Sequence, residues 1–300
     1  MEEYINKTFC IDNLELLKQL PDDSIDLIYC DVLYNTGNKF KFKDGSVAYE
    51  DKLGGDNDVL KFYNPRLIEM KRILKNSGSI FLQCDYRISY LIQFELNKIL
   101  NFQDKIIWKR TETGKGAKGL NVISKDYDEI LHFVKSDIYT KNRFPAPHNS
   151  LSLKEYKYFD DEEGKYFKIV PLGMYSKLSV AKMEENNEIY VTKSGKKYKK
   201  YYLEDVHNSC MSNIWLNCHN LYNGENKEMV DYPTQKPKAL LERIISMFSN
   251  EGDTVVDFFM GSGTTMVVAK ELGRNYIGCD INPRAVEITN KRLNEIKERK

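Results

Sequence analysis

The sequence has no long apolar run, only two tryptophans and no paired cysteines. No stretch approaches the roughly 20 apolar residues of a membrane-spanning helix, and the polar start MEEYINKTFC lacks the regions of a secretory signal. The six cysteines lie singly, without a C-x-x-C spacing, which argues against a disulfide framework and favours a reducing compartment. We therefore expect a cytoplasmic protein that does not enter a membrane.

Net charge is equally scarce, because 45 basic residues face 44 acidic ones and leave +1. A chain-wide basic field is excluded, so any contact with nucleic acid must come from local patches. Two such patches are present, a glycine-rich basic loop at 109–119 and a lysine run at 193–200, which would equally suit a solvated hairpin. The 300 residues suffice for one large α/β domain with an insertion, or for two modest domains.

The C-terminal part contains a glycine turn between two apolar strands. Residues 253–259 have the pattern of a buried strand, Gly261 and Gly263 permit a tight turn, and 264–272 follow as a helix. Asp280 ends the next strand, 19 residues after Gly261, where a carboxylate can bond ribose hydroxyls. The pattern favours a nucleotide-like ligand, with an ordinary strand-turn-helix as the alternative.

The turn also lacks features that a phosphate ligand would need. The third glycine of a dinucleotide fingerprint would fall on Met266, and no G-K-[ST] follows. S-adenosylmethionine (SAM) fits better, since it has free ribose hydroxyls and no phosphate. The predicted cofactor residues are Asp257, Phe258, Phe259, Gly261, Ser262, Gly263, Thr264, Thr265 and Asp280.

A second polar cluster follows the predicted buried strand at 25–30. It reads Asp31-Val-Leu-Tyr34-Asn-Thr-Gly37 and resembles the D-P-P-Y-N-T-G motif of amino-group DNA methyltransferases, which methylate exocyclic nitrogens. The chain departs from that motif at Val32 and Leu33, where two prolines are usual. Proline would stiffen the loop, but the backbone carbonyl of residue 33 survives the change.

The chemistry explains why this cluster suits amino methylation. The lone pair of an adenine amino group is delocalised into the ring, so the nitrogen is a poor nucleophile. A carboxylate (Asp31) and a carbonyl (Leu33) can accept its two hydrogens, while an aromatic ring (Tyr34) stacks on a base flipped out of the duplex. A strand-end aspartate that caps the next turn, beside a tyrosine that only packs, is the alternative.

The rest of the chain alternates strands and helices, which predicts a mostly parallel sheet. Residues 57–75 have helical spacing, and Pro65 is expected to break them into two pieces or to start the second. From 136 to 232 the alternation is lost and 11 of the 20 tyrosines gather, which predicts a β-rich insertion. In the resembling family this is the target-recognition region; a purely structural insertion is the other interpretation.

The motif Thr234-Gln-Lys-Pro237 resembles the one that opens the SAM-binding half in the same family, which adds Gln235 and Lys236 to the predicted cofactor residues. The motif order is that of the beta class. The resemblance implies an α/β, Rossmann-like methyltransferase sheet with helices on both faces and circularly ordered motifs. We expect a catalytic half at 1–135, a recognition insertion at 136–232 and a SAM-binding half at 233–300.

Phosphate contacts are predicted in the glycine-rich basic loop, although a plain surface loop has the same composition. The residues are Lys109, Arg110, Lys115 and Lys118. A zinc site at 207–219 is not expected, since H-x-x-C with an adjacent C-H pair is poor tetrahedral geometry.

Carbon-5 cytosine chemistry is disfavoured, because none of the six cysteines follows a proline, as the nucleophile usually does in that family. The sequence favours N6 methylation of adenine in double-stranded DNA. N4 methylation of cytosine is the nearest rival, although resembling N4 enzymes more often have serine at the place of Asp31. A catalytically silent DNA-binding homologue and a nicotinamide-dependent oxidoreductase are further alternatives. A restriction endonuclease as partner and a homodimeric assembly stay open.

Overall fold

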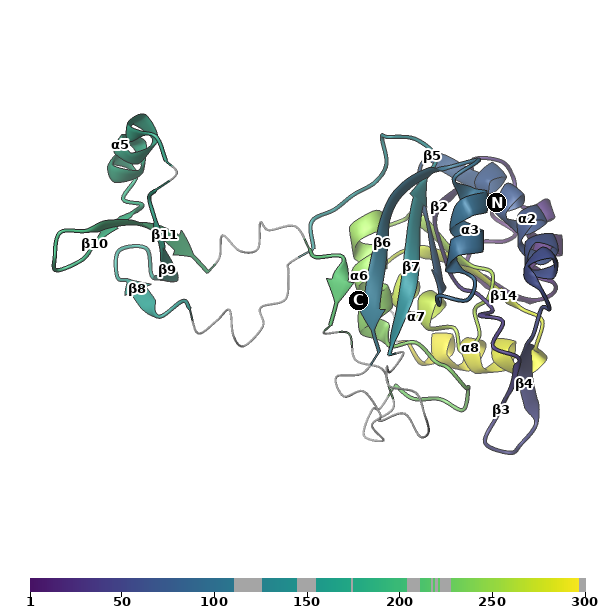
Figure 1. Cartoon of the computed structure of the whole chain (residues 1–300). Helices are drawn as coiled ribbons and strands as arrows, with labels where there is room; N and C mark the ends of the chain where they lie inside the picture. Colours follow the sequence, from purple (N-terminus) through teal and green to yellow (C-terminus); the bar gives the residue numbers. More distant parts are fainter. Residues whose placement is uncertain are drawn as a thin grey trace, which may run out of the picture. The chain divides into compact units, whose positions relative to one another are not determined.

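The structure is a computed structural model of the chain (Figure 1). It describes residues 1–110, 126–144, 155–173, 175–203, 211–216, 218, 221 and 228–296. The chain forms two compact units, one made of Met1–Asn142 and Asn213–Lys300 and the other of Arg143–Ser212.

The first unit is built on an eight-stranded sheet with the order β1-β14-β13-β2-β5-β7-β6-β12. Its strands are β1 (Lys7–Cys10), β2 (Ile25–Asp31), β5 (Leu74–Cys84), β6 (Asn101–Lys109), β7 (Tyr127–Val134), β12 (Ile214–Trp215), β13 (Thr254–Asp257) and β14 (Asn275–Asp280). Neighbouring strands pair in parallel, except that β7 is antiparallel to both β5 and β6. The prediction of a mostly parallel α/β sheet is confirmed.

Helices cover both faces of this sheet. They are α1 (Asn13–Gln19), α2 (Asp56–Ile73), α3 (Ser89–Leu96), α6 (Lys238–Phe248), α7 (Thr264–Glu271) and α8 (Pro283–Glu295). Along β2, Ile28 and Cys30 belong to the core cluster that contains the buried residues of α1, α2 and α3, whereas Leu27 and Tyr29 are equally buried but outside that cluster. Since strand side chains alternate between faces, both faces are covered.

Helix α2 runs without a break from Asp56 to Ile73 with Pro65 inside it, so the predicted division into two pieces is wrong. An internal proline costs a helix about 3 kcal/mol. The buried stripe on this helix outweighs that cost, because each fully buried large apolar side chain contributes roughly 1.5–3 kcal/mol. The stripe consists of Val59, Tyr63, Leu67, Met70 and Ile73.

A hairpin of two strands, β3 (Asn38–Lys41) and β4 (Val47–Asp51), follows the loop after β2. Within the described ranges of the chain, no helix is long and apolar enough to cross a membrane.

The second unit has its own antiparallel sheet with the order β10-β11-β9-β8, and one helix, α5 (Lys177–Glu185). Its strands are β8 (Tyr158–Asp160), β9 (Lys165–Pro171), β10 (Ile189–Val191) and β11 (Lys197–Tyr202). The lysine run at 193–200 forms the turn and second strand of the β10–β11 hairpin. Three of its lysines pair with carboxylates of the same unit: Lys197 with Glu184, Lys199 with Glu188 and Lys200 with Asp160.

Candidate active site

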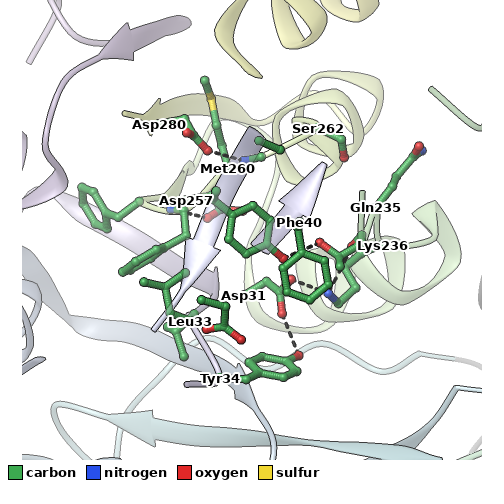
Figure 2. A pocket seen from close by; sticks show the side chains of 18 of the residues that line it. Asp31, Leu33, Tyr34, Phe40, Gln235, Lys236, Asp257, Met260, Ser262 and Asp280 are labelled. Atoms are coloured by element: carbon green, nitrogen blue, oxygen red, sulfur yellow. Dashed lines mark hydrogen bonds and ion pairs between the residues drawn. The ribbon is translucent and has the colours of Figure 1, made fainter. Parts of the chain in front are cut away.

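Three strands of the first unit each end in an aspartate. β2 ends at Asp31, β13 at Asp257 and β14 at Asp280. These strands are parallel neighbours, so their carboxyl ends meet at one edge of the sheet. All three side chains line one cavity of about 600 Å³ (Figure 2). The fold therefore joins the two clusters that the sequence separates by more than 200 residues.

Most of the predicted site residues line this cavity. They are Asp31, Leu33, Tyr34, Arg110, Gln235, Lys236, Asp257, Phe258, Phe259, Gly261, Ser262, Thr264, Thr265 and Asp280. Gly263 is different, because it is not among the lining residues. Its φ is +74°, and a Cβ atom there would lie 2.3 Å from Thr289 of α8. Gly263 thus permits the turn and the close approach of α8.

The glycine turn is held by the two carboxylates beside it. Asp280 accepts hydrogen bonds from the Gly261 N–H at 3.0 Å and from the Asn282 N–H at 2.8 Å. Burial raises the pKa of Asp280. A carboxylate has about four lone-pair positions, so each oxygen of Asp280 can accept a further donor.

Asp257 holds the turn through two hydrogen bonds of its own. Its carboxylate accepts from the Phe259 N–H at 2.9 Å and from the Thr265 hydroxyl at 2.6 Å. Burial raises the pKa of Asp257 to about 7. The side chain therefore fixes the strand, the turn and the first turn of α7 to one another.

The segment before α6 contributes Gln235 and Lys236. The Gln235 amide accepts from the Val230 N–H at 2.8 Å and donates to the Glu228 carbonyl at 2.7 Å, so it holds its own loop closed. Lys236 Nζ donates to Asp31 Oδ2 and pairs with it. The structure thus places this lysine against the predicted catalytic aspartate.

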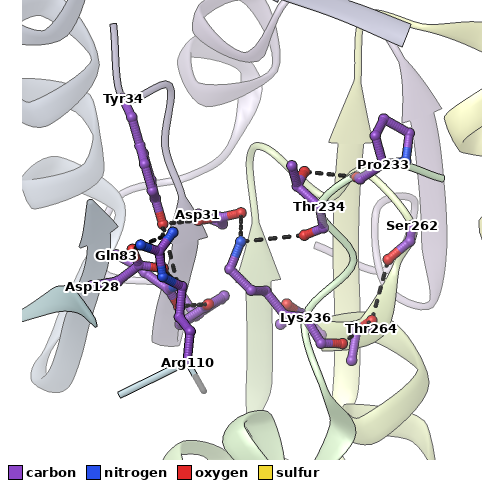
Figure 3. A network of polar contacts seen from close by, with 12 residues as sticks. Asp31, Tyr34, Gln83, Arg110, Asp128, Pro233, Thr234, Lys236, Ser262 and Thr264 are labelled. Atoms are coloured by element: carbon purple, nitrogen blue, oxygen red, sulfur yellow. Dashed lines mark hydrogen bonds and ion pairs between the residues drawn. The ribbon is translucent and has the colours of Figure 1, made fainter. Parts of the chain in front are cut away.

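The hydroxyl of Tyr34 lies between two carboxylates (Figure 3). It is 2.8 Å from Asp31 Oδ1 and 3.1 Å from Asp128 Oδ2, and its single proton can serve one of them at a time. Gln83 donates to Asp128 Oδ2 at 2.9 Å, and the Arg110 guanidinium lies 3.5 Å from Asp128 Oδ1. Burial raises the pKa of both Asp128 and Tyr34. The resulting network fixes the Tyr34 ring at the cavity wall.

The carbonyl of Leu33 accepts a hydrogen bond from the Tyr63 hydroxyl of α2 at 2.9 Å. A carbonyl oxygen has two lone pairs, so one remains for another donor. The preceding residue, Val32, is buried and donates its N–H to the Gln83 carbonyl at 3.1 Å. Position 32 therefore uses a hydrogen bond that a proline could not make.

The predicted phosphate-binding residues divide into two groups. Lys109 is the last residue of β6, and Arg110 lines the cavity. Lys115 and Lys118 lie outside the described residues. So do His207, Cys210 and His219 of the H-x-x-C and C-H pairs, where no zinc site is expected. Cys218 is buried, and burial raises the pKa of its thiol.

Sequence reasoning missed Asp128, Gln83 and Tyr63. It sought polar residues at the carboxyl ends of parallel strands, which identified Asp31 and Asp280. Asp128 lies near the start of β7, and because β7 is antiparallel its amino end reaches the same edge. Gln83 could have been found, since it is a polar residue at the end of the buried strand β5.

Comparisons with known proteins agree with this geometry. A family model for N6/N4 DNA methylases matches residues 25–291. The type II methyltransferase M.HpaI of Haemophilus parainfluenzae is 30% identical over 96% of this chain and 74% of its own length. The DNA adenine methyltransferase YhdJ of Escherichia coli K12 is 28% identical over 94% of this chain and 80% of its own length.

A solved structure extends the likeness to the fold. The M1.HpyAVI–SAM complex has a TM-score of 0.55 at 21% identity and covers 96% of this chain and 98% of its own. The strand order, the cavity at the carboxyl edge of the sheet and the family match lead to one conclusion: this chain belongs to the DNA methylase family of N6 and N4 methyltransferases.

Proposed function

We propose that the protein transfers a methyl group from SAM to the N6 amino group of adenine in double-stranded DNA. One observation carries the proposal: a carboxylate (Asp31), a carbonyl (Leu33) and an aromatic ring (Tyr34) line the same cavity as the glycine turn and Asp280. The name of YhdJ as a DNA adenine methyltransferase supports the choice of base.

The charge of the cavity supports SAM as the cofactor. Eight carboxyl-bearing residues line it: Asp12, Asp31, Glu50, Asp51, Asp85, Asp128, Asp257 and Asp280. Among the described residues that line it, the basic ones are Arg87, Arg110 and Lys236, and each pairs with a carboxylate. An acidic cavity disfavours a pyrophosphate and favours a cation such as a sulfonium.

The cofactor residues divide by chemistry. Asp280 would accept the ribose hydroxyls, since its oxygens keep lone pairs beyond their bonds to the turn. The aromatic wall beside the turn offers apolar contact, because Phe40 stacks on Tyr49 with centroids 4.8 Å apart and both line the cavity. Bound SAM supplies an electrophilic methyl group.

The catalytic residues act on the target nitrogen. The Asp31 carboxylate and the Leu33 carbonyl accept its two hydrogens, which holds the nitrogen nearer to tetrahedral geometry and frees its lone pair. Tyr34 stacks on the base, which must leave the duplex to reach the cavity. Tyr34 and Lys236 each donate to one oxygen of Asp31, and each oxygen keeps a lone pair that can accept a hydrogen of the target amino group.

The test is a methyl-transfer assay with labelled SAM and unmethylated mixed-sequence DNA, followed by digestion to nucleosides. Label in N6-methyl-2′-deoxyadenosine supports the proposal, and label in N4-methyl-2′-deoxycytidine moves the chain to the cytosine branch. Absence of label with intact DNA binding identifies a silent homologue.

We propose further that the second unit reads the DNA sequence. Aromatic side chains are exposed on its sheet, including Phe159 and Tyr166, which pack edge to face at 4.9 Å. Such side chains can contact base edges and methyl groups. Replacing both with alanine should change which sites are methylated and leave the SAM affinity unchanged, whereas an unchanged site preference would contradict this assignment.

We also propose that the protein acts in the cytoplasm, protects DNA from a restriction endonuclease of the same specificity, and forms a homodimer. The relatives' type II methyltransferase names support the endonuclease. Co-expression with candidate endonucleases tests whether the protein protects DNA from them. Sedimentation of the purified protein tests the homodimer.

A further inference from the structure

We propose that Asp51, the last residue of β4, is a positioning residue that holds the catalytic loop of residues 31–37 in its working shape. The inference rests on the function proposed above. It answers a question raised by the motif itself: the loop lacks the two stiffening prolines that are usual in the family, with Val32 and Leu33 in their places. Another constraint must restrict a loop of this kind.

Asp51 accepts hydrogen bonds from the half of the loop that follows Tyr34. Its Oδ1 accepts the Asn35 N–H at 2.8 Å, and its Oδ2 accepts the Thr36 N–H at 3.0 Å and the Thr36 hydroxyl at 2.6 Å. Its backbone carbonyl accepts the Gly37 N–H at 2.7 Å. One residue thus takes hydrogen bonds from three successive loop residues.

Asp51 is buried, which strengthens its hydrogen bonds to the loop. Its exposed fraction is 2%, and charge-assisted hydrogen bonds to backbone N–H groups are among the stronger ones in proteins. Pairing of Asn38 with Asp51 in the β3–β4 hairpin anchors the carboxylate from behind. The loop is therefore tied to a regular element and not only to other loop residues.

The backbone conformation of the loop requires hydrogen bonds of this kind. Asn35 has a φ of +56°, in the left-handed region that L-residues seldom adopt. The Asn35 side chain adds a second tie, because it accepts from the Leu53 N–H at 2.8 Å and donates to the Gly54 carbonyl at 2.9 Å. Tyr34 and the Leu33 carbonyl lie directly upstream, so freedom at Asn35 would displace both groups.

The experiment compares Asp51→Asn with the wild type. Asparagine keeps the shape of the side chain but replaces one acceptor oxygen with an amide that cannot accept from a backbone N–H. We expect kcat at saturating SAM and DNA to fall about 10- to 100-fold, since a misplacement near 1 Å can cost about 100-fold. We also expect faster hydrogen exchange at the Asn35 and Thr36 amides and little change in SAM affinity.

A matched control lies on the same hairpin. Asp44 pairs with Arg284 at the β3–β4 turn and does not line the cavity, so Asp44→Asn should keep the wild-type kcat. Rescue gives the specific readout. No backbone bond from the Leu33 N–H occurs in the described part of the chain, so Leu33→Pro can stiffen the loop, and it should raise kcat more in the Asp51→Asn background than in the wild type.

The outcomes separate the positioning role of Asp51 from the proposed methyl-transfer function. If Asp51→Asn keeps the wild-type kcat and the wild-type rate of amide exchange, the positioning role is overturned. It is also overturned if kcat falls, Leu33→Pro does not restore it, and the SAM affinity falls by an equal factor. If the wild type transfers no methyl group, the proposed function fails. Hydrogen exchange at the Asn35 and Thr36 amides still tests whether Asp51 holds the loop. If Asp51→Asn does not fold, Thr36→Val removes one of the three hydrogen bonds to the Asp51 carboxylate. Faster exchange with a smaller kcat loss then supports the role, and no change in either refutes it.

Discussion

Replacing Asp31 with alanine should separate catalysis from folding. The carboxylate pairs with Lys236, and the side chains of the two residues are 22% and 13% exposed. Breaking a buried pair costs roughly 3–5 kcal/mol by leaving one charge without a partner. Solvent screening lowers this to about 1–3 kcal/mol for a pair that keeps some exposure. The melting temperature of Asp31→Ala should therefore fall by about 2–4 °C for each kcal/mol lost.

Turnover should fall much further than stability. Because the carboxylate acts on the nitrogen as it rehybridises, Asp31→Ala should lower kcat by at least about 100-fold, with SAM binding largely intact by calorimetry. The double variant with Lys236→Met removes the unpaired cation as well, so it should regain stability in a thermal melt but not turnover.

Two results would refute this reasoning. If Asp31→Ala kept a turnover close to that of the wild type, the aspartate would not act on the substrate. If the double variant were less stable than Asp31→Ala, an unpaired Lys236 would not be the source of the destabilisation.

Three further predictions concern the cofactor, pH and DNA. Asp280→Ala should weaken SAM binding roughly 10- to 150-fold in a calorimetric titration, since a charged acceptor contributes about 1.5–3 kcal/mol; an unchanged affinity would remove Asp280 from the site. Burial lowers the pKa of His132 to about 3, below its unfolded value near 6.5, so the stability present above pH 6.5 is lost as the pH falls toward 3. His132→Phe should reduce the loss of melting temperature between pH 6.5 and pH 3, and an unchanged pH dependence would contradict this role of His132. Neutralising Lys115 and Lys118 should weaken binding to all DNA sequences and reduce the salt slope by about 1.8; an altered site preference with the same slope would contradict a phosphate role.

The sequence alone determined the class of sheet and the two clusters of the site. Apolar strands that alternate with helices must form a covered, mostly parallel sheet, and the carboxyl ends of its strands share one edge. Asp31 and Asp280 could therefore be placed at one site without coordinates. The glycine turn was equally readable, because the left-handed φ of Gly261 is a local requirement.

Pro65 shows where local rules fail. The breaking tendency of proline is a property of the helix alone, whereas the burial of α2 depends on strands far away in the sequence. The same limit applied to the catalytic loop. The sequence showed that prolines were missing at positions 32 and 33, but not that Asp51, 15 and 16 residues away, bonds to the next two loop residues after Tyr34.

Only the tertiary structure decided the partners of the predicted catalytic groups. Tyr34 meets Asp128 across 94 positions of the chain, and Asp31 meets Lys236 across 205. Hydrogen bonds and ion pairs act over a few ångströms in space, so their partners depend on the order of the strands and on the direction of each one. The alternation of strands and helices predicted a mostly parallel sheet, but neither its strand order nor the antiparallel course of β7. The antiparallel course of β7 is the decisive case: it brings the amino end of one strand to the edge where the other strands end, and with it the buried carboxylate that holds Tyr34.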